Sequence, residues 1–167
     1  MLPATAASAT VETHDPIETQ RLAAALGRVA RSGDRVCLFG PLGAGKTQFA
    51  KGFAAGLGVT DVVNSPSFTL MAEYEGRLRL FHLDLYRISG VGEALGGGLL
   101  DERQAEGVTI TEWADRLGDS LDRDRLEVRF TVLDEDRRRL ELLAAPAYEP
   151  YIEALVRWRA GDASAEG

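Results

Sequence analysis

The sequence predicts an α/β fold: a three-layer sandwich around a mixed, mostly parallel sheet that ends in an antiparallel hairpin. Two patterns carry this prediction. Short β-branched and aromatic runs alternate with helix-like segments along the first part of the chain, as they do where helices connect parallel strands. Further on, two strand-like runs are joined by a short charged turn, which is typical of a hairpin.

The first expected helix begins at Pro16. Asp15 is a suitable N-cap for it, and Glu18 at the third helical position can reach back toward the chain before the helix. Gly33 is expected to end this helix. The run 35–39 then lies between two glycines and has the length and apolar composition of a buried strand.

The glycine-rich segment 40–45 follows this strand and leads into a second helix, in which Phe49, Phe53 and Leu57 recur every four residues along one face. The functional prediction depends on this order of strand, glycine loop and helix. The remaining expected elements are strands at 78–86 and 108–113 with a glycine-rich stretch at 90–98 and a short polar helix at 101–105 between them, hairpin strands at 126–133 and 139–144, and a closing helix at 150–159.

The length of 167 residues fits a single domain, with a core of about residues 12–160 and flexible tails at 1–10 and 161–167. The net charge of -7 gives the chain no basic surface with which to hold a nucleic acid by itself. The only cysteine, Cys37, lies in an apolar run and has no partner for an intramolecular disulfide. No stretch has the length of a membrane span, so we expect a cytoplasmic protein without membrane contact.

Residues 40–47 read Gly-Pro-Leu-Gly-Ala-Gly-Lys-Thr and match the phosphate-binding pattern G-x-x-x-x-G-K-[ST]. Glycines let the backbone curl so that its N–H groups surround a phosphate, and the following helix adds the positive end of its dipole. Lys46 would contact the β- and γ-phosphates, and the Thr47 hydroxyl would bind Mg²⁺. The chain has only two lysines, Lys46 and Lys51, beside 17 arginines, so the lysine of this motif is distinctive. We therefore predict a P-loop NTPase-like fold with a nucleoside triphosphate site, and a solvated helix position for Lys51.

The distribution of lysines also bears on the base. No lysine follows Lys51, so the Asn/Thr-Lys-x-Asp segment with which GTPases read guanine is absent and ATP is favoured. The chain has no LSGGQ-like stretch and is too short for a RecA-type or AAA-type core. Both observations argue against transporter ATPases and ring motors.

Two acids stand where strands are expected to end. Alternation in 80–86 places His82, Asp84 and Tyr86 on one face, and Glu112 closes the strand at 108–113. Either acid could support the magnesium shell or orient a water molecule. The alternatives are a half-exposed strand with a solvated polar face for the first set, and a helix cap or surface carboxylate for Glu112. His82 by itself is expected to be a structural, hydrogen-bonded histidine.

Four segments together resemble the TsaE (YjeE) family, the bacterial ATPases needed to make threonylcarbamoyladenosine in tRNA. They are residues 40–47, Asn-Ser-Pro-Ser-Phe-Thr-Leu at 64–70, His-Leu-Asp-Leu-Tyr-Arg at 82–87 and Thr-Glu-Trp at 111–113. The first is generic, whereas the second and third are far more specific. The resemblance runs from about residue 18 to residue 139.

The resemblance implies Mg²⁺-dependent ATP hydrolysis with Lys46, Asp84 and Glu112 in the catalytic machinery. Thr47 and Glu112 match the magnesium ligands, residues 65–70 a switch-like segment, and Trp113 a tryptophan associated with activity. The base would lie near 13–19, approached by Arg138 of the hairpin. The expected nucleotide-binding residues are Gly40, Leu42, Gly43, Ala44, Gly45, Lys46, Thr47, Gln48, Ser65, Thr69 and Arg138. Pro41 and Ala114 depart from the usual pattern but remove no ligand.

The implied partners are the proteins TsaD and TsaB, with tRNA reached only indirectly. No arginine is an obvious internal finger, which predicts slow hydrolysis alone and faster turnover with partners. Two other functions remain open: a small P-loop kinase of a nucleoside or metabolite, whose arginine-rich lid would have to come from 137–139, and a nucleotide-gated binding module with negligible turnover. Phosphate release without an added acceptor distinguishes an ATPase from a kinase. Hydrolysis rates that depend on the partner proteins distinguish an ATPase from a binding module.

Overall fold

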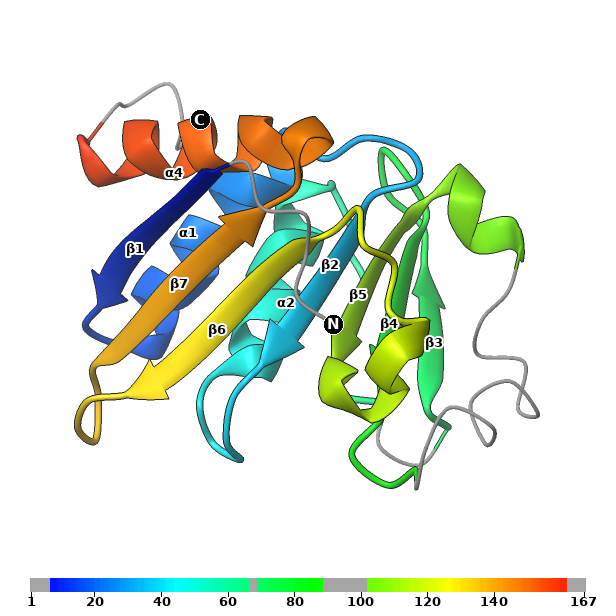
Figure 1. Ribbon diagram of the computed structural model, residues 1–167, viewed down its shortest axis with the longest axis horizontal. Helices are drawn as coiled ribbons and strands as arrows, with labels where there is room; N and C mark the ends of the chain where they lie inside the picture. The colour runs from blue at the N-terminus through cyan, green and yellow to red at the C-terminus, as the bar shows by residue number, and fades with distance from the viewer. Residues whose placement is uncertain (1–6, 67–68, 89–101, 162–167) are drawn as a thin grey trace.

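A computed structural model describes residues 7–66, 69–88 and 102–161 (Figure 1). The strands in these residues form one seven-stranded sheet in the order β1-β7-β6-β2-β5-β4-β3. The strands are β1 (Ala7–Thr13), β2 (Arg35–Phe39), β3 (Met71–Tyr74), β4 (Leu80–Asp84), β5 (Val108–Glu112), β6 (Leu126–Val132) and β7 (Arg138–Ala144).

The centre of the sheet is parallel and both of its sides are antiparallel, which confirms the expected mixed sheet. Strand β2 pairs in parallel with β5 and β6, and β5 pairs in parallel with β4. Strands β6 and β7 form the predicted antiparallel hairpin. Because β2, β5 and β4 run in the same direction, their carboxyl ends meet at one edge of the sheet, where open α/β sheets bind their ligands.

Helices cover the two faces of the sheet unequally. Helix α1 (Pro16–Arg28) and helix α2 (Lys46–Gly56) lie behind the sheet in Figure 1, and α4 (Glu149–Arg159) packs against α1, β1 and β7. The 3-10 helix η2 (Ala114–Ser120) supplies the layer on the opposite face, where Leu117 and Leu121 pack with Phe81, Leu83 and Cys37 in a second core. No described helix is long and apolar enough to cross a membrane.

Helices α1 and α2 pack so closely that three glycines are required between them. A Cβ atom at Gly52 would lie 2.1 Å from the carbonyl oxygen of Gln20, and one at Gly56 would lie 2.2 Å from that of Ala24. At Gly27 it would lie 2.3 Å from the carbonyl oxygen of Phe53. The backbones of the two helices therefore touch directly, and the start of α2 is fixed against α1.

The predicted start of α1 is confirmed. The amide of Glu18 donates to the Asp15 carboxylate at 2.7 Å, and the Glu18 carboxylate reaches back to the amide of His14 at 3.1 Å. The predicted end is wrong, because α1 stops at Arg28 and Gly33 lies in the later turn with a φ of 90°. The short polar helix expected at 101–105 is the 3-10 helix η1 (Glu102–Glu106), and the glycine-rich stretch at 90–98 lies outside the described residues.

The expectation of a loose tail over residues 1–10 is wrong for residues 7–10, which belong to β1. This strand pairs along its whole length with β7, Ala7 facing Ala144 and Thr13 facing Arg138. Strand β3 was also not expected; it pairs with β4 at the other edge of the sheet. Residues 1–6 and 162–167 lie outside the described part of the chain.

Candidate functional site

The glycine loop joins β2 to α2, as the motif requires. Gly43 and Gly45 have φ angles of 79° and 102°, which other residues rarely adopt. Gly40 is needed for space, since a Cβ there would lie 2.9 Å from the Cβ of Phe130. The loop is therefore shaped by glycines at the positions where the sequence places them, and α2 begins at Lys46, where the loop ends.

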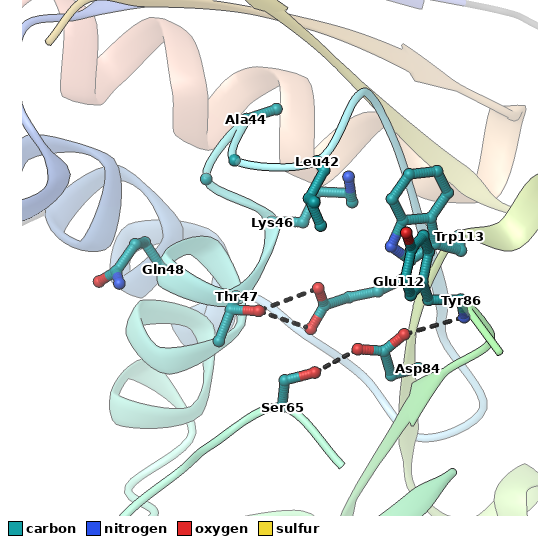
Figure 2. Close-up of a pocket in the computed structure, with 12 residues that line it drawn as sticks. Leu42, Ala44, Lys46, Thr47, Gln48, Ser65, Asp84, Tyr86, Glu112 and Trp113 are labelled. Atoms are coloured by element: carbon teal, nitrogen blue, oxygen red, sulfur yellow. Dashed lines mark hydrogen bonds between the residues drawn. The ribbon is translucent and has the colours of Figure 1, made fainter. Parts of the chain in front are cut away.

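A cleft of about 370 Å³ opens beside this loop at the carboxyl ends of β2, β5 and β4 (Figure 2). It brings together segments that lie far apart in the sequence. Its lining residues are Leu42, Gly43, Ala44, Gly45, Lys46, Thr47, Gln48, Ser65, Asp84, Tyr86, Glu112 and Trp113.

Lys46 is buried in this cleft, with 4% of its surface exposed. Its Nζ donates to the carbonyl oxygens of Gly40 and Pro41 at 2.5 and 2.9 Å and lies 4.1 Å from the centre of the Trp113 ring. Burial lowers the pKa of Lys46, and the nearby carboxylates, first Glu112, oppose this shift. Among the described side chains no carboxylate is within ion-pair distance of Lys46, so the ammonium group is available to an anion in the cleft.

Glu112 stands across the cleft at the end of β5, and 3% of it is exposed. The Thr47 Oγ1 lies 3.0 Å from its Oε1 and 3.2 Å from its Oε2, as the dashed lines of Figure 2 show. The Nε2 of His82 lies 2.6 Å from Oε2. The carboxylate is thus held from two sides, by the first turn of α2 and by β4.

Asp84 ends β4 directly beside Glu112, with which it is paired in register. Its Oδ1 accepts the backbone N–H of Tyr86 at 3.0 Å, and its Oδ2 accepts a hydrogen bond from the Ser65 hydroxyl. All five residues of β4 are buried. The alternative of a half-exposed strand with a solvated polar face is therefore wrong, and so is that of a surface carboxylate for Glu112.

Trp113 has an unusual backbone conformation. Its φ of 59° and ψ of 43° lie in the left-handed region, which a bulky side chain rarely occupies and which costs of order 1–3 kcal/mol. The conformation turns its ring onto Lys46 and against Tyr86, whose ring centre is 4.9 Å away. Strain of this kind next to a cleft is typical of functional sites.

A second, smaller cavity of about 90 Å³ lies on the other side of the glycine loop, between the start of α1 and the β6–β7 hairpin. The Arg138 side chain reaches across it and donates to the carbonyl oxygen of Gly43 at 3.2 Å. The side-chain amide of Gln20 donates to the Gln48 Oε1 at 2.6 Å and ties α1 to α2. The residues that line the smaller cavity are Asp15, Pro16, Thr19, Gly43, Gly45, Gln48, Glu135, Asp136 and Arg138.

The expected nucleotide-binding residues thus gather around the glycine loop, with one exception. Thr69 is exposed, lines neither cavity, and donates to the carbonyl oxygen of Met71 at 3.4 Å. The amide of Leu70 donates to the oxygen of Pro66 at 2.6 Å, and Leu70 has a φ of 68°. Residues 67 and 68 lie outside the described part of the chain.

Two features of the site go beyond the sequence prediction. The bond between His82 and Glu112 was not foreseen, although His82 was expected to be hydrogen-bonded. The parallel pairing of β4 with β5 puts His82 opposite Ile110, two residues before Glu112 on the same face, so the alternation of both strands carried the signal. The contact of Lys46 with Trp113 had no such signal, because it depends on the left-handed turn after β5.

Comparison with known proteins agrees with this geometry. The family model "Threonylcarbamoyl adenosine biosynthesis protein TsaE" matches residues 13–140. The chain belongs to the TsaE family. The Bacillus subtilis (strain 168) tRNA threonylcarbamoyladenosine biosynthesis protein TsaE is 42% identical over 148 residues, which are 87% of this chain and 92% of that protein. The protein of the same name from Treponema pallidum is 37% identical over 123 residues, 74% of this chain and 91% of that one.

The structures agree as well. The crystal structure of Bacillus subtilis YdiB superimposes with a TM-score of 0.75 at 35% sequence identity, and the match covers 92% of this chain and 97% of YdiB. The expected α/β fold with a mixed sheet is therefore confirmed. The matched residues 13–140 contain the glycine loop, both carboxylates and Arg138, so the site described above lies inside the part of the chain that defines the TsaE family.

Proposed function

We propose that this TsaE-family chain is a Mg²⁺-dependent ATPase that serves threonylcarbamoyladenosine formation in tRNA together with TsaD and TsaB in the cytoplasm. The single observation that carries the proposal is the arrangement of Lys46, Thr47 and Glu112 around one cleft. The buried ammonium group of Lys46, which has no carboxylate within ion-pair distance in the described part of the chain, faces a hydroxyl and a carboxylate across the cleft.

The loop and the start of α2 suit the phosphates of a nucleotide. Gly43 and Gly45 line the cleft with left-handed φ angles, a conformation in which backbone N–H groups can surround a phosphate, and the first turn of α2 contributes roughly half a positive charge. Lys46 would exchange its two carbonyl acceptors for phosphate oxygens. A charged acceptor binds an ammonium group more strongly than a neutral carbonyl does, so this exchange favours binding.

The residues present also fit magnesium. In nucleotide sites Mg²⁺ takes one or two carboxylates together with phosphate oxygens and waters, and the Thr47 hydroxyl and the Glu112 carboxylate are oxygen donors of this kind. The described part of the chain has no cluster of three or more His, Cys, Asp and Glu side chains that could hold a metal. We therefore expect the ion to arrive with the nucleotide, and when bound it neutralises charge on the phosphates.

Asp84 would orient the attacking water. It would also couple changes at the γ-phosphate to the position of the segment that contains Ser65. Its two oxygens are engaged by different parts of the chain, Oδ1 by the backbone of Tyr86 and Oδ2 by the Ser65 hydroxyl. A change at the γ-phosphate that moves the Asp84 carboxylate therefore moves Ser65 as well.

The smaller cavity would receive the adenine base. It lies next to the glycine loop on the side of α1. Its lining includes Asp15, Pro16 and Thr19 from the segment 13–19, beside which the base was expected, and Arg138, which was expected to approach the base. No lysine-containing guanine-reading segment exists in the chain, which favours ATP. Gln48 lines both cavities and is fixed by Gln20, so it would lie between the phosphates and the base.

Two substitutions test the proposal. Lys46→Ala removes the phosphate contact, so it should abolish both ATP binding and tRNA modification. Asp84→Ala should abolish modification and hydrolysis while nucleotide affinity, measured by calorimetry, stays close to that of the wild type. Loss of nucleotide affinity in Asp84→Ala would contradict the role given to Asp84.

The dependence on partners needs a separate measurement. No arginine lines the larger cleft among the residues that the structure describes, so hydrolysis by the chain alone should be slow and TsaD with TsaB should accelerate it. Equal phosphate release with and without the two partners would contradict this part of the proposal. Phosphate release without any added acceptor would also exclude the small P-loop kinase, and negligible release even with both partners would leave the nucleotide-gated module.

A further inference from the structure

His82 is the only histidine of the site, and the functions given above to the loop and the two acids do not use it. It lies on β4 two residues before Asp84, and it is completely buried. Its Nε2 lies 2.6 Å from Oε2 of Glu112, which is 3% exposed. A polar ring in such a place needs a reason, because burying it costs free energy unless its polar atoms are paired.

The hydrogen-bond partners of the ring indicate where its hydrogen lies. A carboxylate that binds a metal ion is deprotonated and only accepts hydrogen bonds, so under the proposed function a contact of 2.6 Å requires a hydrogen on Nε2. The other nitrogen, Nδ1, has no hydrogen-bond partner among the described residues. A hydrogen on Nδ1 would be a buried donor without an acceptor among the described residues, which is unfavourable. The arrangement therefore selects the ring form in which Nε2 carries the hydrogen and donates to Glu112.

Glu112 has a second donor that nucleotide binding would remove. The Thr47 hydroxyl contacts both carboxylate oxygens, but under the proposed function it turns to the metal–nucleotide complex. His82 is held inside the sheet and keeps its bond to Oε2. We propose that His82 is a positioning residue that fixes the orientation of the Glu112 carboxylate for the magnesium–nucleotide complex, an inference that rests on the proposed ATPase function.

A purely structural histidine is the competing explanation, and an isosteric pair of substitutions separates the two. His82→Gln keeps an N–H donor close to the place of Nε2, whereas His82→Met has nearly the same shape and volume without the donor. A ring that only fills space is replaced equally well by both. A ring that positions Glu112 is replaced by Gln and not by Met.

The experiment measures nucleotide binding and hydrolysis as functions of Mg²⁺ concentration, using a fluorescent ATP analogue and phosphate release. We expect His82→Met to keep its nucleotide affinity in excess EDTA within about twofold and to need roughly 10–100-fold more Mg²⁺ for half-saturation, as for other residues that hold a metal ligand through a hydrogen bond. His82→Gln should recover most of this loss. Equal Mg²⁺ requirements of the two variants would overturn the inference.

The wild-type protein provides a test that needs no variant. The chain has two histidines, and the other, His14, is exposed, so their imidazole NMR signals are readily told apart. Long-range ¹H–¹⁵N correlation should show the hydrogen of His82 on Nε2, protected from solvent exchange. A hydrogen on Nδ1 with none on Nε2 would overturn the inference.

The outcomes also separate this inference from the proposed function. A wild-type protein whose nucleotide affinity and hydrolysis do not respond to Mg²⁺ overturns both. A wild type that needs Mg²⁺, together with equal behaviour of His82→Gln and His82→Met, overturns only the role of His82.

Discussion

The substitution Gly52→Ala changes the spacing of α1 and α2 without altering any residue that lines the cleft. The added Cβ would lie 2.1 Å from the carbonyl oxygen of Gln20, and ordinary contact begins at 3.4 Å, so the helices must separate by up to about 1.3 Å. The opposing atoms are backbone and cannot turn aside. The same residue, Gln20, holds Gln48 by a hydrogen bond, and α2 begins with Lys46.

The expected cost follows from two opposing effects. Overpacking of a close-packed interior costs about 1–3 kcal/mol, and the upper end applies here because backbone faces backbone. Replacing glycine by alanine inside a helix returns about 1 kcal/mol. The net loss of about 2 kcal/mol in the free energy of unfolding corresponds to a fall of roughly 4–8 °C in the Tm of a chain of this length.

Urea unfolding followed by circular dichroism measures this loss. Ala55→Gly is the matched control, because Ala55 is exposed in the same helix and the change measures the helix-propensity effect alone, a loss of about 1 kcal/mol. We also expect Gly52→Ala to bind ATP more weakly, since α2 carries the phosphate-binding lysine. A Gly52→Ala protein as stable as the wild type, or more stable, would refute the direct backbone contact between the helices.

Three further predictions concern other parts of the fold. Burial raises the pKa of the Cys37 thiol to about 12, whereas an unfolded thiol ionises near 8.5. At pH 8 only about 1 in 10,000 native thiols is ionised, so Cys37 of the native protein should react with iodoacetamide over 100-fold more slowly than in urea. The free energy of unfolding should also fall as the pH rises from about 8.5 towards 12. Fast labelling of the native protein would contradict this prediction. In a Trp158→Phe background, Mg²⁺–ATP should change the emission of Trp113 saturably, because a buried ammonium group lies 4.1 Å from its ring; a flat titration would count against the contact. Glu127→Ala should cost about 3–5 kcal/mol in urea unfolding, since it removes the carboxylate that pairs with the fully buried Arg125 guanidinium, and a loss below 1 kcal/mol would show that the pair is not buried in solution.

The elements around the glycine loop could be predicted because local chemistry determines them. The loop glycines, Lys46 and Thr47 follow each other in the sequence, and each is required by backbone geometry or by phosphate chemistry. Alternation alone placed His82 and Asp84 on one face of β4, and the site lies on that face. These predictions were correct because the contacts that determine the loop and the strand faces lie within a few residues.

The errors at the end of α1 and in β1 have different causes, one local and one distant. Helix α1 stops at Arg28 although no glycine follows there, since Val29 and Ala30 already bond back to the oxygens of Leu26 and Gly27. Strand β1 has little β-branched or aromatic content in its first residues, and its conformation comes from pairing with β7 near the other end of the chain. Thr69 was expected in the site because of a motif, and in the structure it is exposed and lines neither cavity.

The pairing of β1 with β7 also sets an order of events during synthesis. Ala7 can pair only after Ala144 has been synthesised, 137 positions later. At 5–20 residues per second, the delay between the two is roughly 7–27 s. The smaller cavity has walls from the start of α1 and from the hairpin that ends in β7, so it cannot close on a base before then. A strand that stays unpaired for that time is exposed to other chains emerging nearby. The alanine, serine and threonine residues at the start of β1 offer those chains little apolar surface. The composition that made this strand difficult to predict therefore also protects it from aggregation until β7 has been synthesised.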